Sequence, residues 1–174
     1  MALFSERGFR GVAMPELAAH AGIAAATIYR HFDSKEALVN ELYRRCKREL
    51  VDRLSPATPP GVPLRERFHR LWWALIAFAR EQPLAFAFLE LHYHGDYLDD
   101  ASRAVEMEAL VPIAAVLEAG RAEGLVKALP PAPLIVTVWG AFVGMTKAAR
   151  LGYFELSDEL CAQVEGTCWD AIRA

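Results

Sequence analysis

Apolar residues recur at intervals of three and four along most of the chain, which is the spacing of amphipathic α-helices. The pattern predicts helices over 2–6, 14–21, 23–32, 35–54, 64–82, 102–124, 134–151 and 157–172, with an interruption or a bend near Pro112. The segment after Pro83, LAFAFLELHYH, is too apolar for a surface helix, so we expect it to be buried on most sides. No strand-like alternation or repeat appears. The sequence therefore predicts an all-α fold.

A stretch rich in proline follows the helix over 35–54 and is the best linker candidate: Ser55, Pro56, Pro59, Pro60, Gly61 and Pro63. It divides the chain into an N-terminal domain of residues 1–54 and a larger helical domain of residues 55–174. Ser34 is suited to cap the helix that begins at Lys35, and Glu36 lies where the helix dipole favours an anion.

Residues 14–32 have the pattern of two short helices that meet at a glycine. Gly22 can adopt the left-handed conformation that ends the first helix. Five apolar residues would then face inward together: Leu17, Ala18, Ala21, Ile23 and Ile28. Ala18 is small where the two helices would cross. This agreement favours a helix-turn-helix over two unrelated helices, and a helix-turn-helix presents its second helix to the major groove of DNA.

The positions that this packing leaves exposed are the candidates for contact with double-stranded DNA: Ala25, Ala26, Thr27, Tyr29, Arg30, His31 and Lys35. Arg30 can present its planar fork to guanine, and an alanine methyl group can touch thymine. Hydroxyl and ammonium groups suit phosphate contacts, which set register without reading sequence. Packing under the helix is the alternative for Tyr29, and a capping or packing role is the alternative for His31.

Composition agrees with a DNA-binding protein that has its own core. The 174 residues are 54% hydrophobic, enough for a substantial core. The net charge is −3, but residues 1–53 hold nine Lys or Arg against seven Asp or Glu, so the basic end contains the helix-turn-helix. No apolar run reaches the roughly 20 residues of a membrane span, and no leader precedes the domain, so we expect a cytoplasmic protein without membrane contact.

The chain has three cysteines, an odd number without metal-ligand spacing. We expect reduced thiols, with Cys161 and Cys168 one heptad apart as buried packing groups. His92 and His94 with Asp96 raise the question of a metal. Their spacing puts the two histidines on different faces of a helix, so we expect neither metal nor cofactor. Because no nucleophile, base and orienting partner can be placed together, we do not expect an enzyme.

Aromatic and apolar residues of the C-terminal part are candidates to line a cavity for a small ligand: Trp72, Phe86, Leu89, His92, Tyr93 and Leu110. Plain core packing is the alternative for each of them.

Small residues on the helix over 134–151 would allow another helix to approach closely. With a stripe on the last helix, they form a candidate homodimer interface: Gly140, Gly144, Ala148, Leu160, Val164 and Trp169. Packing within the chain is the alternative. A dimer is what a helix-turn-helix needs to read two half-sites.

The run from Gly8 to Leu38, GFRGVAMPELAAHAGIAAATIYRHFDSKEAL, resembles the TetR family of transcriptional repressors. The aromatic after Gly8, the AGI turn, TIYRHF and SKEAL stand at family spacing, and the closing CWDAI is also similar. The resemblance implies a DNA-binding N-terminal domain and a larger helical domain that dimerises, binds a small molecule and thereby releases DNA. It also implies backbone contacts from the residues that match Thr27, Tyr29, His31 and Lys35.

The sequence departs from the family pattern in two respects. Val12 and Ala13 stand where hydroxyl residues are usual and Ala24 where serine is usual, so two helix N-caps are missing. The family's first helix also extends further upstream, so we expect either a start before Met1 or a frayed DNA-binding domain of modest affinity. The sequence thus favours a ligand-responsive repressor that binds a palindromic operator as a homodimer. The alternative is a helical ligand-binding or scaffold protein that has lost DNA binding.

Overall fold

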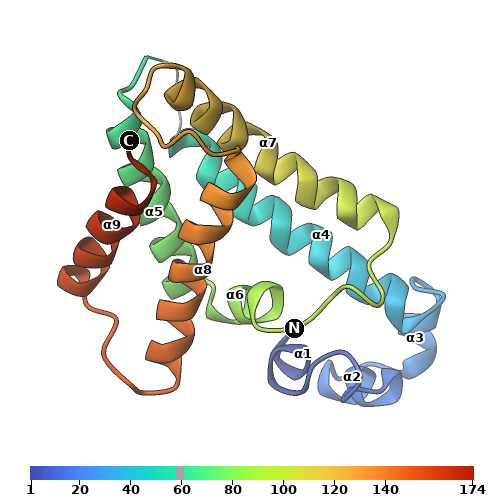
Figure 1. Ribbon diagram of the computed structural model, residues 1–174. Coiled ribbons are helices and arrows are strands. Elements are labelled where there is room, and N and C mark those ends of the chain that lie inside the picture. The colour runs from blue at the N-terminus through green and yellow to red at the C-terminus, as the bar shows by residue number, and fades with distance from the viewer. Residues whose placement is uncertain (58–60) are drawn as a thin grey trace.

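The computed structural model describes residues 1–57 and 61–174, and in these residues it contains α-helices but no strand (Figure 1). The elements are α1 (Ala2–Arg7), α2 (Met14–His20), α3 (Ala25–Tyr29), α4 (Lys35–Leu54), η1 (Ser55–Ala57), α5 (Leu64–Glu81), α6 (Pro83–Glu90), α7 (Asp100–Ala122), α8 (Pro131–Arg150) and α9 (Asp158–Ile172). The predicted all-α fold is confirmed.

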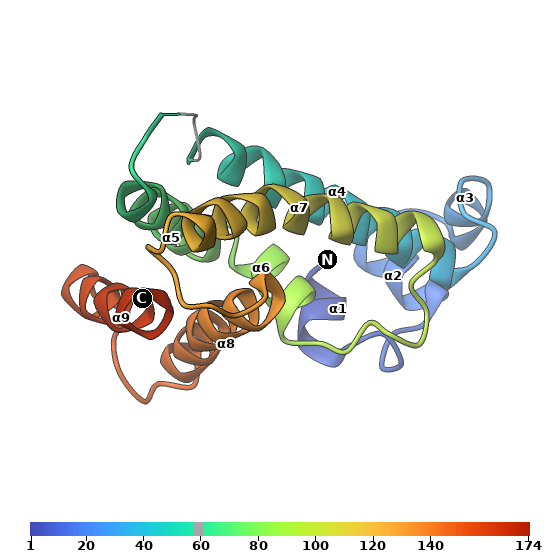
Figure 2. The same cartoon turned by 45° about the horizontal axis from the view of Figure 1, so that its top comes forward.

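The three short helices α1, α2 and α3 lie together at one end of the molecule, and we call residues 1–34 the head (Figure 1). Helix α4 runs from the head along α7, and α5, α8 and α9 pack at the other end (Figure 2). Helix α6 lies between these parts and contacts both α1 and α5.

Helix α4 has the bounds that its sequence predicts. The Ser34 hydroxyl oxygen accepts a hydrogen bond of 3.1 Å from the backbone N–H of Ala37, which satisfies one of the free N–H groups of the first turn. The helix ends at Leu54 and continues as the short turn η1. Pro59 and Pro60 of the predicted linker lie outside the described residues.

One hydrophobic cluster includes residues from both ends of the molecule. Leu3, Phe4 and Val12 of the head belong to the same buried cluster as Tyr43 of α4 and Trp72 of α5. The head therefore packs on the rest of the chain through a shared core, and it is not a separate globule on a linker.

All three cysteines are buried and free, as predicted for Cys161 and Cys168. Burial raises the pKa of the Cys46 thiol to about 11 and also raises the pKa of the other two thiols. The thiols are thus protonated packing groups at neutral pH.

Within the helix-turn-helix, two of the five residues expected to face inward do not. Ala18 and Ile28 are buried and Leu17 is half-buried, but Ala21 and Ile23 are exposed. The reason is that α2 ends at His20 and α3 begins only at Ala25, so the connecting turn lies outside the packed face. The second helix is correspondingly shorter than the predicted 23–32.

Two further expectations need correction. Helix α7 runs through Pro112 without interruption, so the predicted break is wrong there. Helix α6 ends at Glu90, so His92 and His94 lie in the loop before α7 and not on a helix. Within the apolar segment, residues 85–89 are buried as expected, whereas Tyr93 is exposed.

Helix α8 is long and apolar enough to cross a membrane by length and composition, contrary to the expectation that every apolar run is too short. Only 22% of its most apolar window is buried in the chain. Because so little of this window is buried, α8 has an apolar surface that the single chain leaves uncovered. Such a surface is suited to packing against another protein molecule.

Candidate DNA-binding surface and ligand cavity

The turn between α2 and α3 depends on one glycine. Gly22 has φ of 68°, a left-handed conformation that side chains disfavour, as the sequence predicts. Met14, Ala18 and Ile28 form a small buried cluster that fixes α3 across α2. Neither helix has a side-chain cap, because Ala13 and Ala24 occupy the N-cap positions, in agreement with the missing caps noted in the sequence.

The structure brings the predicted DNA-contact residues to one end of the molecule. Ala26, Tyr29, Arg30 and His31 are exposed, and Ala25, Thr27 and Lys35 are half-buried. The Arg30 guanidinium forms no ion pair within the described part of the chain. Its planar donor group is therefore free to meet an acceptor outside the protein.

Lys35 has a structural role that sequence reasoning missed. Its ammonium group donates hydrogen bonds of 2.9 Å to the carbonyl oxygens of both Phe9 and Val12, and it lies 4.2 Å from the centroid of the Phe9 ring. These contacts hold the α1–α2 loop against the start of α4. At most one of its three N–H groups remains for a phosphate.

The head contacts the loop between α6 and α7 along a seam of polar and aromatic groups. The Ser5 hydroxyl donates to the Leu84 carbonyl at 2.9 Å, and the Ser5 carbonyl lies 2.9 Å from His92 Nε2. The Phe9 and Tyr97 rings are stacked with centroids 4.1 Å apart. These contacts tie α1 and the loop after it to α6 and the loop before α7.

His94 lies beneath this seam in a buried hydrogen-bond network. Its Nε2 is 2.6 Å from the Phe88 carbonyl oxygen and its Nδ1 is 2.6 Å from the Tyr97 hydroxyl. Burial lowers the pKa of His94 below its usual value, so the ring is neutral. Nε2–H then donates to Phe88, and Nδ1 accepts from Tyr97.

A buried polar cluster joins α4 to the start of α7. The Asn40 side chain donates to the Tyr97 carbonyl at 2.8 Å and accepts from the Asp99 N–H at 2.9 Å and from the Ser102 hydroxyl at 2.8 Å. The Arg44 guanidinium reaches both carboxylate oxygens of Asp99, at 3.1 and 3.0 Å. The cluster fixes the position of α4 beside the seam.

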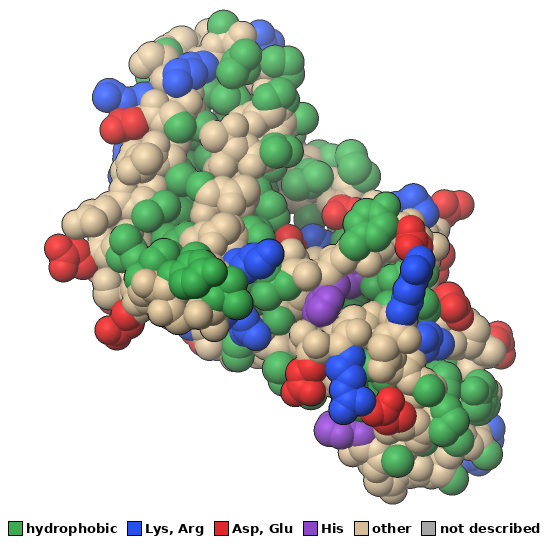
Figure 3. Space-filling view, turned by 60° about the horizontal axis from the view of Figure 1, so that its bottom comes forward, with side chains coloured by type: hydrophobic (Ala, Val, Ile, Leu, Met, Phe, Trp, Pro, Cys, Tyr) green, Lys and Arg blue, Asp and Glu red, His purple; other side chains and the backbone are tan. Residues whose placement is uncertain are grey.

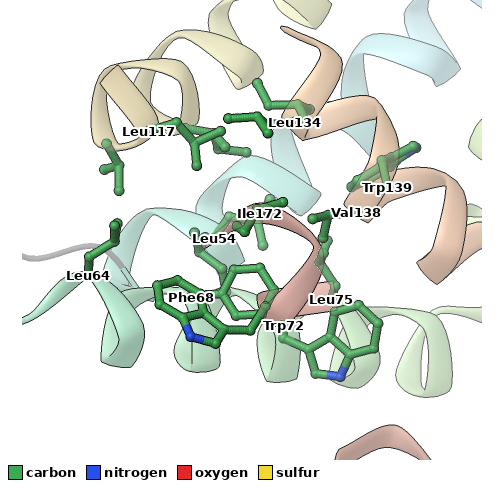
Figure 4. Close-up of a pocket in the computed structure, with 15 residues that line it drawn as sticks. Leu54, Leu64, Phe68, Trp72, Leu75, Leu117, Leu134, Val138, Trp139 and Ile172 are labelled. Atoms are coloured by element: carbon green, nitrogen blue, oxygen red, sulfur yellow. The ribbon is translucent and has the colours of Figure 1, made fainter. Parts of the chain in front are cut away.

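The far end of the molecule contains a cavity of about 80 Å³ (Figure 4). Helices α4, α5, α7, α8 and α9 supply its walls, and all of the lining residues are apolar: Leu54, Leu64, Phe68, Leu71, Trp72, Leu75, Ile113, Val116, Leu117, Leu134, Ile135, Val138, Trp139, Trp169 and Ile172. The lining suits an apolar ligand, and the volume is below the roughly 300–1,000 Å³ of pockets for drug-sized ligands.

Of the six predicted ligand-contact residues, Trp72 alone lines this cavity. Phe86 is buried in the core, and Leu110 lines none of the described pockets. His92 and Tyr93 line an open cleft of about 370 Å³ beside the head, and with Leu89 they line another of about 320 Å³ beside α4.

The sequence does not identify Trp139 as a cavity residue, because the small residues of its helix, α8, indicate a dimer interface. Its indole ring lines the cavity, and its N–H donates to Glu90 Oε2 at 2.9 Å. The other oxygen of Glu90 lies 3.4 Å from Nζ of Lys47 on α4, and both charged side chains are about nine-tenths buried. Two contacts thus connect the cavity wall to α4.

A buried carboxylate joins α5 to α9. The Glu165 side chain is 3% exposed and accepts hydrogen bonds from Arg65 at 2.6 Å and from the Trp73 indole at 3.0 Å, and it contacts His69 Nδ1 at 2.9 Å. Periodicity alone assigns Glu165 to a helix and does not reveal these partners.

The predicted interface residues fall into two groups. Gly140 and Gly144 are exposed, and a side chain built on either would meet nothing within 4 Å. Ala148, Leu160 and Val164 are half-buried, and Trp169 lines the cavity and packs on Phe68 with ring centroids 5.4 Å apart. No group of three metal-ligating side chains occurs in the described residues.

A helix-turn-helix with an exposed reading helix, joined through one long helix to a larger helical domain, defines a class of helix-turn-helix transcriptional regulators. The model of the bacterial regulatory proteins of the tetR family matches residues 1–42, and that of the tetracyclin repressor-like C-terminal domain matches residues 43–174. The chain belongs to the TetR family and is a transcriptional regulator.

Known proteins resemble the chain to different extents. The uncharacterized HTH-type transcriptional regulator YhgD of Bacillus subtilis is 24% identical over 130 residues, 74% of this chain and 68% of that protein. The HTH-type transcriptional repressor KstR2 of Rhodococcus jostii is 35% identical over 69 residues, 40% of this chain and 34% of that protein. The crystal structure of a TetR family regulator from Marinobacter aquaeolei has a TM-score of 0.88 and 23% identity, covering 99% of this chain and 90% of its own.

Replacing Lys35 by methionine keeps the apolar stem and removes both hydrogen bonds to the loop. We expect Lys35→Met to lower the free energy of unfolding by at least about 2 kcal/mol, since each of the two hydrogen bonds from the charged group contributes roughly 1.5–3 kcal/mol. Chemical denaturation measures this change. Arg48→Met, at an exposed position of the same helix, is the matched control. Equal stability of the two variants would contradict the role of Lys35.

Proposed function

We propose that this regulator is a cytoplasmic repressor that binds a palindromic operator as a homodimer and leaves it when a small apolar or aromatic molecule occupies the cavity. The observation that carries the proposal is that one long helix, α4, contacts the head at its start and the cavity at its end. Lys35 at the start of α4 holds the head, and Leu54 at its end lines the cavity.

Operator binding is supported by the exposure of Tyr29, Arg30 and His31 at the tip of the head. Arg30 is the candidate base reader, because a free guanidinium can contact guanine with two parallel hydrogen bonds. Tyr29, His31 and the remaining N–H of Lys35 are candidates for phosphate contact.

The effector response is supported by the route from Trp139 to α4. A ligand that fills the cavity presses on the Trp139 ring, whose N–H holds Glu90. Glu90 pairs with Lys47, so a shift of Trp139 changes the contacts that position α4. The head moves with α4 because Lys35 and the shared core attach it there.

Dimerisation is supported by the uncovered apolar surface of α8. Val136, Gly140 and Gly144 are exposed along this helix, and no neighbouring group of the same chain approaches the two glycines. A second copy would bury this surface and would position two heads for two half-sites.

Replacing Arg30 by alanine should weaken binding to the selected operator by about 1–3 kcal/mol and relax base preference at one position of each half-site. Fluorescence anisotropy on operator and random DNA across a salt series measures both effects. Arg121→Ala on α7, remote from the head, is the control. An equal loss for Arg30→Ala on operator and random DNA would contradict its role as a base reader.

Gly144→Leu should convert the dimer into a monomer, which sedimentation velocity measures. The added side chain meets nothing within the chain, so the monomer should stay folded and gain helix propensity of about 0.8–1 kcal/mol. Ala119→Leu at an exposed position of α7 is the control and should remain dimeric. A folded Gly144→Leu variant that dimerises like the wild type would exclude this face.

Benzene, the smallest aromatic hydrocarbon, should bind the cavity and similar small hydrocarbons with it, and they should quench tryptophan fluorescence, since Trp72, Trp139 and Trp169 line the cavity. Coupling is reciprocal, so operator DNA should weaken their binding about 5- to 150-fold in calorimetric titrations. Val116→Phe fills part of the cavity, so it should abolish hydrocarbon binding and, by taking the place of the ligand, lower operator affinity without any hydrocarbon. Val111→Phe, exposed on the same helix, should keep both the operator affinity and the hydrocarbon binding of the wild type. Identical ligand affinities with and without operator would rule out the proposed switch.

A further inference from the structure

The side chains of the turn before α3 and of the first residues of that helix are all hydrocarbon. Ala24 and Ala26 are exposed, and Ile23 has 44% of its surface exposed. We call these three residues the apolar tip. Figure 3 shows hydrophobic side chains gathered at this end of the molecule.

The apolar tip has no polar side chain beside it along the chain. Residues 21–26 read AGIAAA, and none of these side chains carries a hydrogen-bond donor or acceptor. The first polar side chain is Thr27, which is half-buried, and Arg30 follows one turn after Ala26. In a helix-turn-helix, the N-terminal residues of the second helix are the ones that contact base edges. The part of the head that enters deepest into the groove therefore offers methyl and methylene groups.

Base edges differ in how they meet such a surface. In the major groove, guanine and adenine present N7 and an exocyclic polar group, cytosine presents its amino group beside a small C5–H, and thymine presents a C5 methyl group beside its carbonyl oxygen. An apolar side chain against a polar edge displaces water without replacing its hydrogen bonds, which costs free energy. Against a methyl group the same side chain buries apolar surface from both partners. An apolar surface therefore favours thymine in two ways: it gains free energy against the methyl group and loses free energy against the other bases.

We propose that the apolar tip reads C5 methyl groups, so that each operator half-site places thymine, or 5-methylcytosine, against Ile23, Ala24 and Ala26. 5-Methylcytosine carries its methyl group at the same ring position as thymine, and unmodified cytosine lacks it. This inference rests on the proposed operator binding and names the chemistry by which the operator is recognised. Methylation of cytosine at this position would then strengthen binding.

The test begins with an operator selected from random-sequence duplex DNA by the full chain. Each thymine of the half-site is then replaced by deoxyuridine, which removes only the methyl group, and the dissociation constant is measured by fluorescence anisotropy. At the position that faces the apolar tip, we expect a loss of about fourfold per half-site, the factor for one buried methyl group. At that position 5-methylcytosine should bind more tightly than cytosine.

A protein variant ties the effect to the apolar tip. Ala26→Ser places a hydroxyl in the groove, so its affinities for the thymine and deoxyuridine operators should become nearly equal. Ala104→Ser on the exposed face of α7 is the matched control and should keep the fourfold ratio. Indifference of the wild type to deoxyuridine at every position, with operator binding intact, would overturn methyl reading alone. Failure to enrich any sequence would overturn operator binding and, with it, this inference.

Discussion

The arrangement of this protein depends on α4 belonging to two packed regions at once. Lys35 at its start binds the carbonyls of the head loop, and Leu54 at its end forms part of the cavity wall. A helix of 20 residues spans about 30 Å without an internal joint, so a small rotation at one end displaces the other. The chain therefore needs no separate hinge between its reading helix and its cavity.

The polar contacts along α4 restrict how this helix can move. Asn40 is 3% exposed, and it exchanges hydrogen bonds with three groups of the loop and helix beside it. Buried polar groups lose free energy when a partner is removed, so intermediate positions of α4 are disfavoured. If α4 is displaced, this whole set of hydrogen bonds must be replaced by another set. We therefore expect α4 to have two discrete positions and no continuous range of positions between them.

Much of the fold was predictable because its signals are local. The cap at Ser34, the left-handed Gly22 and the end of α4 at Leu54 each follow from a few neighbouring residues. The helix bounds elsewhere differ by a few residues. The start of α3 was misplaced because Ala24, at its N-cap position, provides no side-chain cap that marks a helix start.

The candidate sites were less predictable because distant segments create them. The cavity takes side chains from five helices, and periodicity places each residue on a helix without indicating which helices meet. The sequence predicts that Lys35 contacts DNA phosphate. In the structure its ammonium group binds two carbonyl oxygens of residues more than 20 positions earlier in the chain. His92 and His94 were assigned to a helix, whereas α6 ends before them and leaves both rings in a loop.

The continuous core has a consequence for building hybrid regulators. Leu3, Phe4 and Val12 pack in the same cluster as Tyr43, Trp72 and Phe88, so a junction placed at the end of the helix-turn-helix cuts through one packed interior. A head transplanted from a relative would bring its own side chains into that interior and leave voids or overlaps there. A head exchanged between relatives therefore needs the facing residues of α4 and α6 to be exchanged with it, because these residues complete the interior that the head packs into.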